Sequence, residues 1–111
     1  YACRYHMVDK HWQIVRHHGQ KAEYGKIEPV PLDLVPPGVV HTALRATRCV
    51  GDGLYGVDIK RIGRKNFVME VNDNPNIDHG YEDSVLGDEL YLSIMRGLWE
   101  RVLQHKGGRT R

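Results

Sequence analysis

The sequence predicts an α+β domain, in which an antiparallel sheet carries helices packed on one face. Three observations predict this class. Apolar and polar residues alternate near the N-terminus and again between residues 54 and 72, which is typical of strands. Residues 37–50 and a longer C-terminal segment instead repeat their apolar residues at helical spacing. The expected order is strand, strand, helix, strand, strand, helix, and short connections between consecutive strands imply antiparallel pairing.

Length and composition restrict the class of protein. The chain has 111 residues, and we expect a single domain with its own core. Apolar residues make up 41% and charged residues 27%, which excludes a wholly disordered chain. The net charge of +2, with histidine neutral, is too small to direct the whole domain to a nucleic acid. No apolar run approaches the ~20 residues of a membrane helix, and Cys3 and Cys49 are expected as free thiols in a cytoplasmic protein.

The N-terminal half is expected to contain a hairpin, a loop and a helix. Residues 1–8 alternate as a strand does, and after a short turn residues 11–15 supply the second strand. Glycine and proline punctuate residues 16–37, which predicts a loop or lid-like excursion, either functional or merely connecting. A helix then begins at Pro37, which suits a first turn, and ends at Gly51.

The C-terminal half is expected to contain a second hairpin and a long helix. Strands are predicted over 54–61 and 66–72. Ser84 or Asp83 is expected to cap the last helix, which has acidic residues in its first turn and basic residues at its end, as the helix dipole favours. Its apolar residues recur every four positions, at Leu86, Leu90, Ile94, Leu98 and Val102.

Three polar residues of the second hairpin are predicted to converge. Side chains two apart on a strand share a face, so Glu70 and Asn72 point the same way while Phe67, Met69 and Val71 point into the core. If the turn has three residues, 63–65, then Asp58 faces Glu70 with the Cβ atoms ~5 Å apart. A two-residue turn would instead place Asp58 opposite Met69.

This convergence predicts a metal site. Like charges that face each other across a hairpin destabilise it, and a cation between them removes the repulsion. The oxygens of Asp58, Glu70 and Asn72 are hard ligands that suit Mg²⁺ or Mn²⁺. The alternative is an exposed sheet face on which all three are solvated and Lys60 neutralises the charge.

The same residues carry a resemblance to a known family. The sequences GLYGVDIK over residues 53–60 and VMEVNDNP over residues 68–75 resemble the ATP-grasp superfamily, and within it the ligases of the RimK type, which join glutamate or similar amines to a carboxylate. The resemblance implies that Asp58, Glu70 and Asn72 are the Mg²⁺ (or Mn²⁺) ligands that bind ATP through its phosphates. It also implies an ATP-grasp C-terminal subdomain as the fold.

The resemblance is partial. The chain has no glycine-rich loop of the kind that covers ATP phosphates, and no strand with the second adenine-side lysine; in the family both precede this region. Because the strand pattern begins at Tyr1, we expect 1–111 to be a C-terminal fragment of a larger enzyme that is inactive alone and needs its N-terminal part as partner. The expected substrates are a small-molecule or peptide carboxylate and an amine, which the sequence does not identify further.

Other residues allow alternative functions. The acidic pair is also compatible with a non-enzymatic binding domain, and basic and aromatic residues of the first hairpin with an RNA-binding surface, although an ordinary half-buried hairpin is favoured. The seven histidines lack zinc-ligand spacing. His79 is a candidate to approach substrate, Asn74 and Asn76 to orient the metal loop, and Trp99 to form core or a domain contact. The residues of the RNA alternative are Arg4, Lys10, Arg16, Lys21, Lys26, Tyr1, Tyr5, Trp12 and Tyr24.

Overall fold

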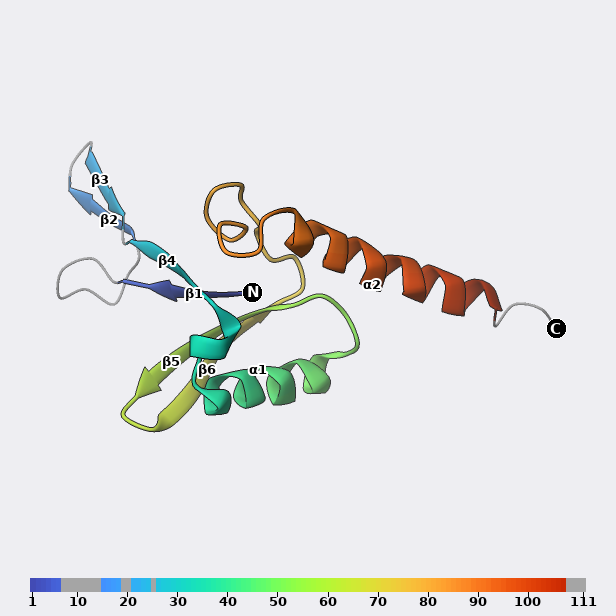
Figure 1. Cartoon of the computed structure of the whole chain (residues 1–111). Coiled ribbons are helices and arrows are strands. Elements are labelled where there is room, and N and C mark those ends of the chain that lie inside the picture. The colour runs from blue at the N-terminus through green and yellow to red at the C-terminus, as the bar shows by residue number, and fades with distance from the viewer. Residues whose placement is uncertain (7–14, 19–20, 25, 108–111) are drawn as a thin grey trace.

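The computed structural model describes residues 1–6, 15–18, 21–24 and 26–107 (Figure 1). The α+β class is confirmed, because antiparallel strand pairs occur together with two α-helices. The described strands form three two-stranded sheets rather than one larger sheet. These pair β1 (Ala2–Tyr5) with β4 (Ile27–Val30), β2 (Val15–His18) with β3 (Lys21–Tyr24), and β5 (Gly56–Ile62) with β6 (Lys65–Asn72).

Strand β1 pairs with a segment that the sequence did not indicate. Strand β1 pairs with β4, with Cys3 opposite Pro29, and the His6 N–H donates to the Lys26 carbonyl at 2.8 Å beyond the strand end. Most of the predicted second strand, residues 11–14, lies outside the described residues. Local turn signals could not reveal a pairing between segments so far apart in the chain.

The prediction of a loop over 16–37 is wrong. This segment contains most of β2, then β3 and β4, and a 3₁₀ helix (η1, Leu32–Leu34). Proline suggested irregular structure, but Pro29 lies within β4. In a two-stranded sheet both strands are edges, so a proline can turn its missing donor toward the unpaired side.

The first helix is confirmed. Helix α1 (Pro37–Val50) has proline at its first position and ends at Gly51, whose N–H donates to the Thr47 carbonyl at 2.9 Å. Val39, Val40 and Ala43 are half-buried, and α1 packs against both strands of the β5–β6 hairpin.

The β5–β6 hairpin has a two-residue turn, not the predicted three-residue one. Ile62 lies opposite Lys65, and Gly63 has a φ of +59°. A register shift between Asp58 and Ile59 then leaves Met69 as an extra residue on β6. Asp58 therefore still lies opposite Glu70, as predicted. Two core predictions are wrong, because Phe67 is exposed and Met69, on the bulge, is 66% exposed.

The last helix starts later than expected. Helix α2 covers Asp88–Gly107, so Leu86 lies outside it. The predicted caps bond elsewhere: Ser84 Oγ donates to the Tyr81 carbonyl at 2.7 Å, and the Asp83 carboxylate binds groups of its own turn and Tyr91. The acidic first turn and basic last turn are as predicted. Of the apolar positions expected in this helix, Leu90 is buried and Ile94 half-buried, whereas the residues at 98 and 102 are exposed.

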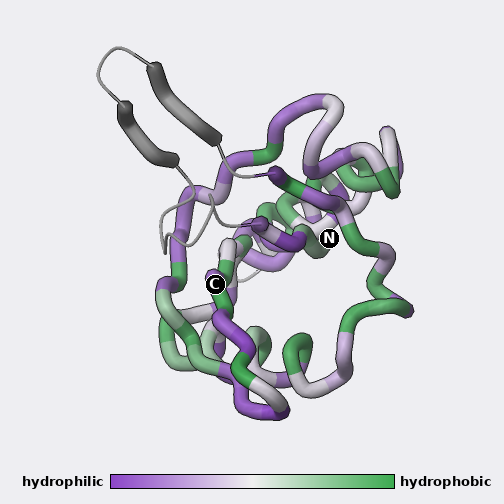
Figure 2. Tube along the Cα trace, turned by 90° about the vertical axis from the view of Figure 1, so that its left-hand side faces the viewer, coloured by the Kyte–Doolittle hydropathy of each residue, from purple (hydrophilic) through white to green (hydrophobic). Residues whose placement is uncertain are grey.

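The fold is open. Its radius of gyration is 16.9 Å, against about 13 Å for a compact domain of this length. The accessible surface is 9336 Å², against roughly 6,300 Å² for a compact chain of this mass. Helix α2 runs away from the sheets (Figure 1), and hydrophobic stretches lie at the periphery of the trace as well as nearer its centre (Figure 2). No helix among the described residues is both long and apolar enough to cross a membrane.

Two glycines give opposite predictions for stability. Gly87, just before α2, has a φ of +56°, whereas Gly97 lies in mid-helix with open space around its missing Cβ. We expect Gly87→Ala to lower the free energy of unfolding by about 1–2 kcal/mol, because a Cβ disfavours this conformation. Gly97→Ala should raise it by about 0.5–1 kcal/mol. Urea unfolding of both variants tests this, and a stabilising Gly87→Ala would contradict it.

Candidate functional site

The predicted polar residues converge on one cavity. Across the hairpin Asp58 lies opposite Glu70 and Gly56 opposite Asn72, so the three side chains belong to alternate positions of the ladder, which share one face. All three line a cavity of about 660 Å³ that lies between the hairpin, α1 and β1. The extra residue at Met69 makes this arrangement possible, because an unbroken ladder from the two-residue turn would have put Asp58 opposite Met69.

Four carboxylates line the cavity, and among the described residues no basic side chain pairs with Asp58 or Glu70. Asp78 and Glu82, from the segment after β6, also line it, and Glu82 is buried. None of the ion pairs within the described part of the chain involves Asp58 or Glu70. Lys60, the residue expected to neutralise them, lies opposite Phe67 and forms none of these pairs. Like charges that lie opposite each other destabilise a strand pair, and a cation bound between them would offset this.

Asn72 has a second role in the turn that follows β6. Its Oδ1 accepts a hydrogen bond from the Asn74 N–H at 2.9 Å, which is the local turn chemistry of asparagine. A carbonyl oxygen has two lone pairs, so one remains for another ligand. Within the described residues no three His, Cys, Asp or Glu side chains are placed to hold a metal ion. The candidate set contains two carboxylates and one amide.

Strand β1 forms a wall of the cavity that sequence reasoning missed. Burial, and then the charge of Glu82, raise the pKa of Tyr1 to about 12. Burial also raises the pKa of Tyr5. The Tyr1 hydroxyl therefore stays protonated, and it donates to the Asn76 carbonyl at 2.9 Å. This bond attaches β1 to the segment after β6, and no local sequence signal could have indicated it.

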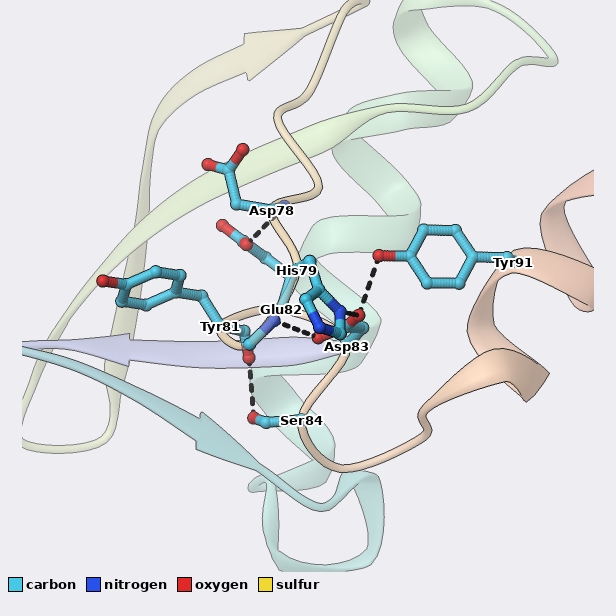
Figure 3. A network of polar contacts seen from close by, with 8 residues as sticks. Asp78, His79, Tyr81, Glu82, Asp83, Ser84 and Tyr91 are labelled. Atoms are coloured by element: carbon cyan, nitrogen blue, oxygen red, sulfur yellow. Dashed lines mark hydrogen bonds and ion pairs between the residues drawn. The ribbon is translucent and has the colours of Figure 1, made fainter.

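A hydrogen-bonded network around Asp83 orders the segment between β6 and α2 (Figure 3). Asp83 is 5% exposed. Its Oδ1 accepts the Gly80 N–H at 2.6 Å, and its Oδ2 lies 2.8 Å from both the Tyr91 hydroxyl and His79 Nδ1. The hydrogen bonds from His79 and Tyr91 lower the pKa of Asp83. Sequence reasoning assigned Asp83 only to a helix cap, although its acceptor capacity fits this role better.

The described histidines and basic N-terminal residues do not support a substrate contact by His79, and two of them pair with Glu28. His79 is held by Asp83, its side chain is 97% exposed, and it does not line the cavity. His6 Nε2 lies 2.8 Å from a Glu28 oxygen, and Arg4 lies 3.7 Å from the same carboxylate. The other members of the basic and aromatic group on residues 10–24 have side chains outside the described part of the structure.

Comparison with known proteins gives no family. No protein-family model, curated protein or solved structure matches the chain. The features of the chain that bear on function are therefore the cavity, the opposed carboxylates Asp58 and Glu70, and the sequence of the two strands that carry them.

The Asp83 network predicts acid sensitivity. Because its pKa is lowered in the folded protein, ionised Asp83 stabilises the fold above the ordinary carboxyl value of 3.8, and this stability is lost as the pH falls through the lower folded pKa. We expect Asp83→Asn to be less stable than the unmodified chain near neutral pH, with the difference shrinking toward about pH 2. Urea unfolding across this range measures it.

The matched control is Asp33→Asn, which removes the same charge from an exposed position in η1. A stability difference between Asp83→Asn and the unmodified chain that stays constant down to about pH 2 would contradict the role assigned to the ionised carboxylate.

Proposed function

We propose that this chain supplies the metal-binding wall of the ATP site in an ATP-dependent carboxylate–amine ligase of the ATP-grasp type. One observation carries the proposal: Asp58 and Glu70 face each other across the hairpin, at a cavity, and neither belongs to an ion pair of the described residues. The resemblance of both strands to this superfamily assigns metal ligation to the same residues.

The donor set fits Mg²⁺ or Mn²⁺. Magnesium commonly binds one or two carboxylates and completes its octahedron with water and substrate phosphates. Asp58 and Glu70 supply two carboxylates, and Asn72 Oδ1 keeps a lone pair beside its bond to Asn74. All three side chains are exposed and open on the cavity, which leaves space for phosphate oxygens. The absence of sulfur and imidazole from the set disfavours zinc.

The proposed reaction has two steps. The γ-phosphoryl group of ATP moves to a substrate carboxylate, giving an acyl phosphate and ADP; an amine then attacks the acyl carbon and phosphate leaves. A bound Mg²⁺ supplies charge neutralisation at the phosphates. Asp58, Glu70 and Asn72 position the metal-bound phosphates, and none of them transfers a proton in this scheme.

The other half of the ATP site belongs to a different part of the protein in this proposal. This chain contains no glycine-rich loop to cover the phosphates and no second lysine for the adenine side. Residues 1–111 therefore bind Mg–ATP only on one side and do not complete the ligation alone. In the full-length cytoplasmic enzyme, the preceding segment is the partner of this wall, and the carboxylate and amine substrates are small molecules or peptides.

Divalent metal should stabilise the chain. A ligand that binds only the folded state stabilises it by RT ln(1 + [L]/Kd), which is about 1.4 kcal/mol at ten times Kd. We expect millimolar Mn²⁺ to raise the free energy of unfolding, and Glu70→Gln and Asp58→Asn each to abolish this gain. Urea unfolding with and without Mn²⁺ measures it.

Two substitutions control for the loss of a negative charge. Glu100→Gln on α2 and Asp33→Asn on η1 remove equivalent charges at exposed positions away from the cavity, and both should keep the Mn²⁺ effect. Stabilisation by Mn²⁺ that survives Glu70→Gln would remove Glu70 from the ligand set.

Nucleotide binding distinguishes the ligase from a non-enzymatic interaction domain. If the metal bridges the wall and the phosphates, ATP and Mn²⁺ added together should stabilise the chain by more than the sum of their separate effects. Glu70→Gln should make the two effects additive, and Glu100→Gln should leave them cooperative. Unfolding titrations with ATP, Mn²⁺ and both provide the test, and additivity in the unmodified chain would favour the interaction domain.

A further inference from the structure

Helix α2 carries an exposed apolar face. Seven of its apolar side chains remain 37% to 62% exposed, although they lie next to one another on the helix. At 3.6 residues per turn they occupy one continuous arc. The adjoining arc holds buried Leu90, half-buried Ile94, and Arg101, which pairs with Asp52 at 2.7 Å. The apolar face (Tyr91, Leu92, Met95, Leu98, Trp99, Val102 and Leu103) therefore adjoins the side by which α2 contacts the rest of the chain.

The exposed apolar residues of α2 are arranged nearly symmetrically about the level of Gly97, although Leu98 of this face matches Arg96. Counting outward from Gly97, Met95 matches Trp99, Leu92 matches Val102 and Tyr91 matches Leu103. At the ends Asp88 matches Lys106, which carries the opposite charge, and both lie on the side of the helix that carries the apolar face. Two antiparallel copies of the helix, centred at the level of Gly97 and in contact on the side opposite to that residue, would thus bring apolar residues together along the middle and Asp88 against Lys106 at both ends.

The size of the face is sufficient for a dimer. With about 150–250 Å² for a large side chain, the measured exposures amount to roughly 600 Å² on each copy. This equals the upper range of the largest apolar patch on a typical monomer, which is about 300–600 Å². Two such faces bury roughly 1,200 Å², the lower limit of specific interfaces. The helix is about 30 Å long, so the contact would run along most of it.

We propose that α2 is the interface of a two-fold symmetric homodimer in which the apolar faces of the two helices pack antiparallel, with their centres at the level of Gly97. In a parallel pair the acidic first turns of the two helices would lie side by side, and so would the two basic last turns. Like charges would then repel at both ends. The antiparallel pair also opposes the helix dipoles, and it places Met95 of each copy against Trp99 of the other, which is a favourable sulfur–aromatic contact. This inference is independent of the proposed ligase function.

Sedimentation equilibrium of the 111-residue chain tests the association. We expect a concentration-dependent shift from 12.8 kDa to twice that mass. Met95→Glu should weaken dimerisation at least about a hundredfold, because it places a carboxylate in the interface of both copies. Met95 is 62% exposed, so this change should leave the fold intact, as circular dichroism can verify. Gln104→Glu on the polar side of α2 is the matched control and should keep the dimer.

Charge reversal at the ends tests the orientation. Lys106→Glu and Asp88→Lys should each weaken the dimer by about fivefold, because each change reverses both symmetry-related end pairs. The double variant Asp88→Lys/Lys106→Glu should restore the affinity. Four outcomes would each overturn the proposal. The chain stays monomeric to about 0.2 mM, or it grows beyond a dimer. Alternatively, the dimer survives Met95→Glu, or the double variant binds no more tightly than the single variants.

Discussion

The register of the β5–β6 hairpin is the constraint on which the candidate site depends. A two-residue turn closes the hairpin, and a ladder continued without interruption would set Asp58 opposite Met69 and Glu70 opposite Val57. The extra residue at Met69 shifts the ladder by one and brings Asp58 and Glu70 face to face. A bulge thus re-aims side chains at the point where the sheet meets the cavity, a position in which bulges are common. Met69 extends into solvent in consequence.

The second element of the site is the segment after β6, which is held by polar contacts within the segment and by one long-range hydrogen bond, not by a large core. Glu82 and Asp83 are the buried charged residues of the described chain, and both accept backbone N–H groups of their own segment, from Asp78 and Gly80. Tyr1 then ties this segment to β1 through the Asn76 carbonyl. Satisfied buried carboxylates fix a loop in one geometry, which explains how the cavity keeps its acidic wall in so open a fold.

The sequence correctly predicted the elements that are marked by residues within the element or at its ends. Pro37 and Gly51 mark α1, and the alternation around Asp58 and Glu70 marks the second hairpin. The sequence-based prediction failed where segments far apart in the chain pair, as β1 and β4 do. Pro29 suggested a loop, because the neighbouring residues do not reveal that it lies on the edge of a sheet. The opposition of Asp58 and Glu70 was predicted with the wrong turn and no bulge, and these two errors cancelled. Asp83 was assigned to a cap because its competing partner Tyr91 lies eight residues away.

The exposure of the proposed metal wall has a thermodynamic consequence. Asp58, Glu70 and Asn72 are exposed, so water screens the repulsion between the carboxylates and also weakens their attraction for a cation. In the proposed site the wall by itself would bind metal weakly, and tight binding would require the further oxygens of a nucleotide and a cover that excludes water. By linkage, the factor by which bound nucleotide raises the affinity for metal equals the factor by which bound metal raises the affinity for nucleotide. An open wall of this kind favours joint binding of metal and nucleotide over a resident metal ion.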